Sequence, residues 1–179
     1  DANVYFGLAK LNNSGRKAED VESLQSIWVD LDCGPDKVED ESSTGRPKGY
    51  ATKREAQVAL KSFCGTTGLP IPAVIDSGGG IHAYWALTEE VPRDNWQPII
   101  DRLKQVCVTQ KFYADPNVFD SSRVLRVPGT YNHKYDPPAL VKVLWPAAGR
   151  SAPERITPEE LRDILGVDAN AVAVQKGPR

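Results

Sequence analysis

Hydrophobic and polar residues alternate along six segments of the chain, with the period of two residues expected of a strand that has one buried face. The segments cover residues 4–8, 27–32, 73–77, 81–87, 124–127 and 140–144. They are distributed along most of the chain, so the pattern does not indicate an all-helical protein.

Three further segments carry the signals of helices. Thr52 opens the capping-box pattern TKRE ahead of a hydrophobic run, and Gly65 is expected to end that helix. A second helix is expected over about 94–110, where Pro98 is tolerable only in the first turn. The segment TPEELRDILG (157–166) predicts a third helix, with threonine as its cap and glycine at its end.

Strands and helices follow one another in mixed order, so the expected fold class is α/β or α+β, with helices covering one sheet. Residues 33–49 are expected to form a polar, acidic loop without regular structure. Residues 1–167 are expected to form one catalytic domain, and residues 168–179 a flexible tail or a linker to further domains.

The composition is that of an ordinary globular domain, with 179 residues of which 40% are hydrophobic and 26% charged. Cys33, Cys64 and Cys107 are widely spaced, which argues against a disulfide framework or a zinc site and fits a reducing cytoplasm. No apolar run is long enough for a membrane span. The chain starts at Asp1 and lacks methionine, so we interpret it as a piece of a longer protein.

The net charge of −2 argues mildly against a general nucleic-acid-binding protein, which usually has a basic face. The charges are unevenly distributed, however: residues 18–41 are strongly acidic and residues 121–150 are basic. A basic surface could therefore face an acidic one. Solvated charges on unrelated surfaces remain the alternative.

The strand IWVDLD (27–32) places its three aliphatic residues on one face and Trp28, Asp30 and Asp32 on the other. The two carboxylates would lie about 7 Å apart along the strand. Mg²⁺ or Mn²⁺ would relieve their mutual repulsion, because these hard cations bind carboxylates and phosphate oxygens. The alternative is a strand end that exposes two acids to water.

The stretch IDSGGGIHAYWAL (75–87) joins three glycines to one of the two histidines, His82. The glycines could supply the positive φ angles of a hairpin, or let the backbone approach a phosphate closely. A glycine-rich hairpin beside a hydrogen-bonded histidine would explain the same residues without a ligand.

A third stretch, DPNVFDSSRVLRVPGTYNHK (115–134), combines acids, arginines and a Pro-Gly turn. The planar guanidinium groups of Arg123 and Arg126 suit phosphate oxygens, and Lys134 adds a point charge. Composition alone would also fit a basic loop of any kind.

Taken in order, the three stretches resemble the motifs of the archaeo-eukaryotic primase superfamily, the primase-polymerases, and in particular the replication primases of phages and plasmids. The first motif is the D-x-D of WVDLD, the second is the histidine of SGGGIHAYW, and the third is an acid ahead of R-x-x-R-x-P-G-T-x-N. The second motif is often Ser-x-His, whereas here Gly80 stands two residues before His82 and the serine is Ser77.

The resemblance implies a primase-like core of helices packed on a mainly antiparallel or mixed sheet. It also implies a DNA primase or polymerase that carries out template-dependent nucleotidyl transfer with two Mg²⁺ or Mn²⁺ ions. The partners would be a DNA template and primer, NTP or dNTP substrates, and a fused or associated helicase. The catalytic and metal-binding residues would be Asp30, Asp32 and Asp120. The nucleotide-binding residues would be Ser77, Gly78, Gly79, Gly80, His82, Arg123, Arg126 and Lys134.

The third metal-binding acid could be Asp120 or Asp115. Asp115 precedes Pro116, and Asp-Pro commonly opens a turn that occupies the carboxylate. Asp120 follows the hydrophobic Phe119, as in the third motif of the superfamily, and is therefore our prediction.

Two other functional classes remain open. A metal-dependent nuclease or relaxase-type replication initiator could use acids and a histidine, although Tyr84 stands where the relaxase H-x-H pair would need its second histidine. The chain could also be a non-catalytic nucleic-acid-binding module of an initiator. Nicking of supercoiled plasmid and template-dependent nucleotide incorporation would separate these possibilities.

Overall fold

The computed structural model describes residues 2–12, 15–38 and 46–168. Its centre is a five-stranded sheet in the order β2-β3-β5-β4-β9, in which every neighbouring pair of strands is antiparallel. The strands are β2 (Ala9–Leu11), β3 (Val21–Asp32), β4 (Ala73–Asp76), β5 (Gly80–Pro92) and β9 (Lys142–Trp145). The expected α/β class with a mainly antiparallel sheet is confirmed.

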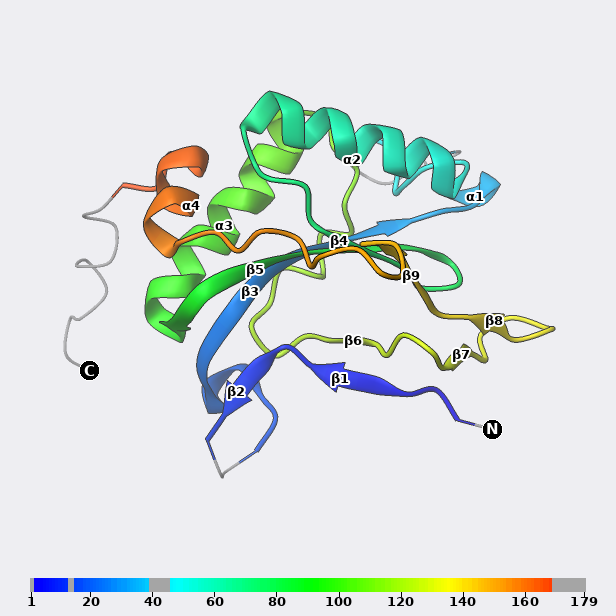
Figure 1. The fold of residues 1–179 in the computed structure, drawn as a ribbon, viewed down its shortest axis with the longest axis horizontal. Coiled ribbons are helices and arrows are strands. Elements are labelled where there is room, and N and C mark those ends of the chain that lie inside the picture. Colours follow the sequence, from blue (N-terminus) through cyan, green and yellow to red (C-terminus); the bar gives the residue numbers. More distant parts are fainter. Residues whose placement is uncertain (1, 13–14, 39–45, 169–179) are drawn as a thin grey trace.

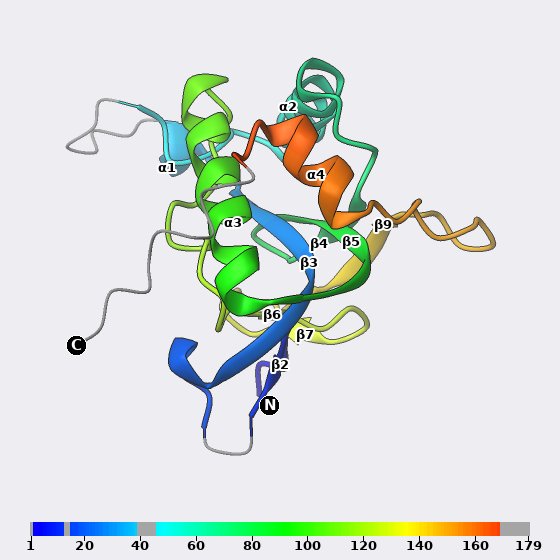
Figure 2. The same ribbon diagram turned by 90° about the vertical axis from the view of Figure 1, so that its left-hand side faces the viewer.

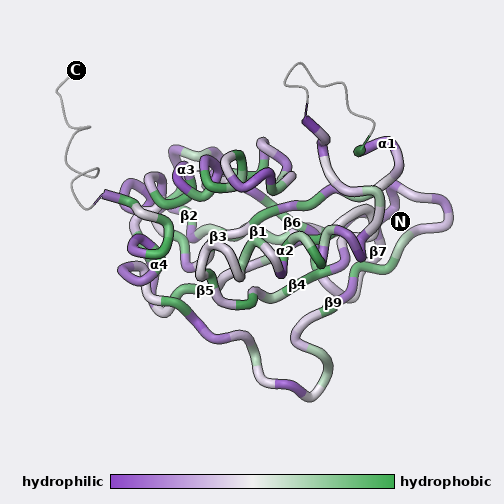
Figure 3. Tube along the Cα trace, turned by 90° about the horizontal axis from the view of Figure 1, so that it is seen from above, coloured by the Kyte–Doolittle hydropathy of each residue, from purple (hydrophilic) through white to green (hydrophobic). Residues whose placement is uncertain are grey.

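Helices cover one side of this sheet, as Figures 1 and 2 show. The main helices are α2 (Lys53–Thr67), α3 (Arg93–Thr109) and α4 (Pro158–Leu165), and two short ones are the 3₁₀ helix η1 (Ala18–Asp20) and α1 (Pro35–Val38). Hydrophobic and hydrophilic positions alternate along α2 and α3 in Figure 3, as expected of helices with one buried face. In the described part of the chain no helix is long and apolar enough to cross a membrane.

Two short ribbons complete the fold. β1 (Tyr5–Gly7) pairs with β6 (Val124–Arg126), and β7 (Tyr131–Asn132) pairs with β8 (Ala139–Leu140). The β1–β6 ribbon lies on the side of the sheet opposite α2 and α3 (Figures 1 and 2). The fold thereby brings the N-terminal strand beside the segment that follows α3.

The strand that carries the acid pair is firmly packed. Residues 26–32 of β3 pair in register with residues 80–86 of β5, and the three aliphatic side chains of IWVDLD are fully buried. On the other face Trp28 is also fully buried, stacks on Trp96 of α3 at 5.2 Å between ring centroids, and donates its indole N–H to the Val118 carbonyl. Each such side chain contributes about 1.5–3 kcal/mol by its burial, so β3 is a rigid support.

Most of the elements expected from the sequence are present. The three predicted helices correspond to α2, α3 and α4, and four of the predicted strands correspond to β3, β4, β5 and β6. Both β3 and β5 are longer than the alternation indicated. Segment 4–8 forms β1, which ends at Gly7, and a separate strand β2 follows it.

Three expectations about helices were wrong. α2 does not end at Gly65 but continues to Thr67, because the left-handed cap conformation occurs at Gly68, with φ of 84°. Pro98 lies inside α3 beyond its first turn; the carbonyl that it leaves without a donor is near the helix N-terminus, where water can satisfy it. Segment 33–49 contains α1, while its residues 39–45 lie outside the described residues.

The single strand expected over 140–144 was also wrong. The chain changes partners at Val141, whose N–H donates to the Thr130 carbonyl and whose carbonyl accepts from Gly129, both at 2.8 Å. The residues before Val141 therefore pair with β7, and the residues after it form β9 of the main sheet. Of the expected tail, residues 169–179 lie outside the described residues.

Candidate active site

Asp30 and Asp32 lie near the end of β3 and line one cavity of about 200 Å³. His82 of β5 is the direct cross-strand partner of Asp30, and its Nε2 lies 3.8 Å from Asp30 Oδ2. Residues that face each other in an antiparallel pair project to the same side of the sheet. The strand register alone therefore places the histidine of the second motif beside the acids of the first.

Asp30 is held in an environment that disfavours its charge. Burial, followed by the negative charges of Asp32 and Asp115, raises the pKa of Asp30 from 3.8 to about 7. The positive charges of Arg123 and Lys37 oppose this effect but do not cancel it. The positive charge near Asp30 is thus too weak to stabilise its ionised carboxylate fully.

His82 is buried and neutral at physiological pH. Burial, reinforced by the positive charge of Arg126, lowers the pKa of His82 to about 4. Its Nδ1 lies 3.2 Å from the hydroxyl oxygen of Tyr84. Burial together with the charge of Asp30 raises the pKa of Tyr84 well above its ordinary value, so the hydroxyl stays protonated and can donate a hydrogen bond to Nδ1. In that tautomer the imidazole proton is on Nε2, which faces Asp30.

Asp32 is more exposed and has a partner. Lys37 of α1 donates to Asp32 Oδ2 at 3.1 Å. Lys37 is itself mostly buried, with a side chain 25% exposed. The short helix that the sequence did not reveal therefore supplies a cation to the acid pair.

The three consecutive glycines lie at the turn between β4 and β5, and the backbone requires glycine most clearly at Gly78 and Gly80. Gly78 has φ of 92°, a conformation that residues with side chains rarely adopt. A Cβ on Gly80 would collide with the Leu31 carbonyl of the neighbouring strand, and one on Gly79 would collide with the Tyr135 hydroxyl. The turn serves both as a hairpin and as a place where backbone approaches other groups closely.

Two polar residues hold this turn in place. Asp76 is buried, accepts from Lys53 Nζ at 2.6 Å and accepts from the Gly78 N–H at 2.9 Å. Asn132 is also buried and donates from Nδ2 to the Ser77 carbonyl at 2.8 Å. The Gly78 N–H is thus engaged by Asp76 rather than directed at a ligand.

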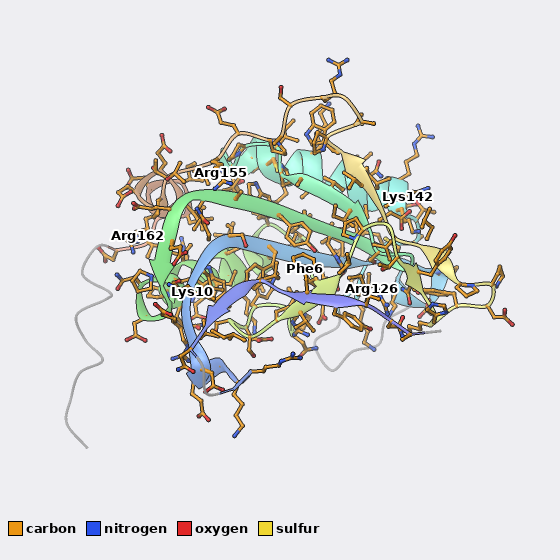
Figure 4. The ribbon with its side chains drawn as sticks, turned by 60° about the horizontal axis from the view of Figure 1, so that its bottom comes forward. Phe6, Lys10, Arg126, Lys142, Arg155 and Arg162 are labelled. Carbon is orange, nitrogen blue, oxygen red and sulfur yellow. The ribbon has the colours of Figure 1, made fainter. Side chains whose placement is uncertain are left out.

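Cationic residues line the same cavity as the acid pair. Arg126 donates to Asn3 Oδ1 at 2.6 Å and lies 4.9 Å above the ring of Tyr5. Figure 4 shows Arg126 and Phe6 on the face of the sheet turned away from the helices. Arg123 also lines the cavity, and its buried Nε has no hydrogen-bond partner among the described residues. Such a donor is positioned for an acceptor such as a phosphate oxygen.

Most of the site residues expected from the sequence meet in this cavity. Those that line it are Asp30, Asp32, Ser77, Gly79, His82, Arg123, Arg126 and Lys134. Gly78 and Gly80 belong to the turn that forms its edge.

The two candidates for a third acid lie in different surroundings. The Asp115 N–H donates to the Asp30 carbonyl at 2.8 Å, and the Asp115 charge contributes to the raised pKa of Asp30. Asp115 Oδ1 also accepts from the N–H of Asn117. Asp120 accepts two hydrogen bonds from Ser122 and pairs with Arg123 at 3.0 Å. Both acids thus close turns, and Asp115 is the one whose backbone is joined to β3.

The acid pair offers a suitable but incomplete donor set for a divalent cation. Within the described ranges, no group of three His, Cys, Asp or Glu side chains is arranged to hold a metal ion. The crowded negative charge that raises the pKa of Asp30 would be relieved by a cation. Mg²⁺ commonly takes one or two carboxylates and completes its shell with water and phosphate oxygens, so the residues fit such an ion.

Sequence reasoning missed several members of the site. Tyr5 and Tyr135 line the cavity, and Lys37 pairs with Asp32, although none of the three belongs to a recognised motif. Asp76 and Asn132 lie within the quoted stretches, beside residues that the motifs had already singled out.

Known proteins resemble this chain in part of its sequence and in its fold. No family model matches the chain. A replication protein of Clostridium perfringens is 30% identical over 137 residues, which cover 75% of this chain and 30% of that protein. The chain thus matches less than a third of the length of this relative. The AEP domain of the primase-polymerase of cyanophage S-2L superposes with a TM-score of 0.62 at 18% identity, over 91% of this chain and 70% of that chain.

The fold is that of an archaeo-eukaryotic primase (AEP) domain. The fold that the resemblance in sequence motifs implied is therefore confirmed, and the sequence similarity is to a replication protein.

Proposed function

We propose that this chain is the catalytic domain of a DNA primase or polymerase that acts in the replication of a phage, plasmid or related element. The observation that carries the proposal is the composition of the 200 Å³ cavity, which two carboxylates line together with Arg123, Arg126 and Lys134. A nucleoside triphosphate with divalent cations is complementary to both kinds of charge. Its phosphates would meet the cationic side chains, and the carboxylates would hold Mg²⁺ or Mn²⁺.

Asp30, Asp32 and a third acid would hold two Mg²⁺ or Mn²⁺ ions. When bound, such a pair lowers the pKa of a primer 3′-hydroxyl and neutralises charge on the attacking and leaving oxygens. The hydroxyl oxygen forms a bond to the α-phosphorus, the bond from that phosphorus to the bridging oxygen of the β-phosphate breaks, and pyrophosphate leaves. The hydroxyl proton passes to water. The protein contributes chiefly by positioning the reactants and by its charges.

His82 would act as a hydrogen-bond donor to the triphosphate. Its lowered pKa keeps it neutral, and the Tyr84 hydroxyl at Nδ1 leaves the proton on Nε2, on the side of the cavity. A neutral donor can bind a phosphate oxygen without forming an ion pair that would hold pyrophosphate after the reaction. The charge on the phosphates is left to the arginines and Lys134.

For the third acid, the contacts favour Asp115 over Asp120. Asp115 is joined to Asp30 through a backbone hydrogen bond and interacts with its charge. The two oxygens of Asp120 already have partners in Ser122 and Arg123. The motif comparison favours Asp120. Nucleotide incorporation by Asp115→Asn and Asp120→Asn decides between the two acids.

The test is incubation with a template, labelled nucleotides and Mn²⁺, with and without a primer, beside Asp30→Asn and Asp32→Asn. Wild-type incorporation that depends on the template and is lost in both variants supports the proposal. Incorporation by both variants at the wild-type rate would contradict it. Nicking of supercoiled plasmid without incorporation would indicate a nuclease or relaxase-type initiator, and strand binding without either reaction would indicate a binding module.

A further inference from the structure

A second cavity, of about 420 Å³, lies beside the acid pair. One wall is formed by residues 46–48 and the other by residues 114–117, and Asp32 lines it together with Asp115. Asp32 also lines the first cavity, whereas Gly79, His82, Arg123 and Arg126 line only the first. The two cavities therefore share Asp32, and their other lining residues differ.

Both walls of the second cavity are anchored to the end of β3. The Tyr50 N–H donates to the Asp32 carbonyl at 3.0 Å, and the Asp115 N–H donates to the Asp30 carbonyl at 2.8 Å. Tyr50 also joins the walls to each other, since its hydroxyl accepts from the Tyr113 N–H at 3.1 Å. Gly49 packs so closely on the Asp32 carbonyl that a Cβ would collide with it. The cavity is thus built into the fold.

Charge is distributed unevenly within the second cavity. Its acidic lining residues are Asp115 and Asp32, of which Asp32 also lines the first cavity, and Arg46 and Lys48 lie in the wall formed by residues 46–48. A ligand complementary to these charges has an oxygen that can bind a metal ion at one end and an anionic group at the other. The 3′-terminal nucleotide of a nucleic-acid strand has this polarity, with a free hydroxyl on one side of its sugar and a phosphodiester on the other.

We propose that the second cavity receives the 3′ end of the primer strand, with its hydroxyl toward Asp32 and Asp115 and its phosphodiester at Arg46 and Lys48. The inference rests on the proposed function and adds where the strand enters. Displacement at phosphorus needs the attacking and leaving oxygens roughly in line. A triphosphate in the first cavity places its leaving group among the arginines and His82, so the attacking hydroxyl comes from the other side of Asp32. The volume falls within the range of about 300–1,000 Å³ usual for small-ligand sites.

The experiment measures strand binding directly, by fluorescence anisotropy of a labelled primer–template, and measures the KM for primer and for nucleotide separately. The variant is Arg46→Ala with Lys48→Ala. Its control is Arg54→Ala with Lys61→Ala, which removes the same charge from exposed positions of α2. The melting temperature of each variant establishes that it is folded, and the exposed Lys48→Glu alone provides a second variant.

We expect the cavity variant to weaken primer binding and raise the primer KM at least tenfold, with less than a twofold change in the nucleotide KM. Because two phosphate contacts are lost, the magnitude of the slope of log K against log salt should fall by about 1.8 for the primer–template duplex, and the control should match wild type. In EDTA, a strand that ends in a 3′-phosphate should bind several-fold more weakly than one with a 3′-hydroxyl, because the added charge meets Asp32 and Asp115.

Equal primer binding by the cavity variant and its control would overturn the inference, even if wild type incorporates nucleotides normally. A rise in the nucleotide KM alone would also overturn it. Equal binding of the two strand ends would overturn the proposed orientation. If wild type incorporates no nucleotide, the proposed function fails, and the binding comparison still decides whether this cavity holds a strand.

Discussion

Replacing Asp30 by asparagine should stabilise the metal-free protein at alkaline pH. The carboxyl lies beside Asp32 and Asp115 and is largely removed from water, and its pKa is raised from 3.8 to about 7. In the folded protein it therefore holds a proton between about pH 4 and pH 7 that the unfolded chain has lost. Stability falls as the pH rises through this window, because the native state binds more protons there than the unfolded state does.

The magnitude follows from the pKa. A rise from 3.8 to about 7 corresponds to about 4 kcal/mol of stability lost at pH 8, at 1.36 kcal/mol per pKa unit. Asparagine does not ionise, so Asp30→Asn avoids this loss. For a chain of this size about 4 kcal/mol shifts the melting temperature by roughly 8–16 °C. Near pH 4 the two proteins should melt within a few degrees of each other.

The assay is thermal unfolding of both proteins in EDTA at several pH values from 4 to 8. The lowered pKa of His82 makes stability rise with pH between about 4 and 6.5, but this effect is present in both proteins and cancels in their difference. Glu89→Gln, which removes an exposed carboxylate of β5, is the control and should change little at any pH. A difference between wild type and Asp30→Asn that does not grow with pH would refute the account of Asp30.

Four further outcomes are expected. Asp120→Asn should lose less than about 1 kcal/mol of stability, because its amide oxygen can still accept from Ser122 and only the part-exposed ion pair with Arg123 is lost. Asp115→Asn should lose more nucleotide incorporation than Asp120→Asn, and the reverse order would make Asp120 the third metal ligand. His82→Ala should raise the nucleotide KM about tenfold or more in steady-state assays while leaving the primer KM unchanged, and an equal change in both would contradict its proposed place at the triphosphate. Gly80→Ala should destabilise the protein by roughly 2 kcal/mol or more in urea unfolding. Gly65→Ala adds a methyl group that meets no atom within 4 Å and should stabilise the protein by about 0.5–1 kcal/mol. Equal effects of the two substitutions would show that Gly80 is not tightly packed. The chain should extend primers better than it starts new strands, and efficient dinucleotide synthesis without a primer would contradict this.

Features that depend on a few neighbouring residues could be predicted from the sequence. Thr157 caps α4 and Glu160 completes the capping box, as the spacing indicated, and Gly166 ends the helix in the left-handed conformation. The alternation in IWVDLD correctly placed the acids on the face opposite the aliphatic residues. These outcomes follow from the backbone geometry of single elements, which the local order of side chains determines.

Features that join distant segments could not be read in the same way. The sequence does not state that His82 faces Asp30, because this depends on the register between β3 and β5. The ion pair between Lys53 and Asp76, the approach of Tyr135 to Gly79 and the change of partner within 140–144 likewise depend on which segments pack together.

The choice between Asp120 and Asp115 shows the same limit. Both acids look alike in sequence, since each can close a turn with its own carboxylate. Only the fold brings the Asp115 backbone against β3, and only burial gives Asp30 its raised pKa. The order of residues along the chain determined which chemical groups are present and which face of each element carries them. The tertiary structure decided which of those groups share a cavity, because the distances and desolvation that govern their charges arise only when separate elements pack.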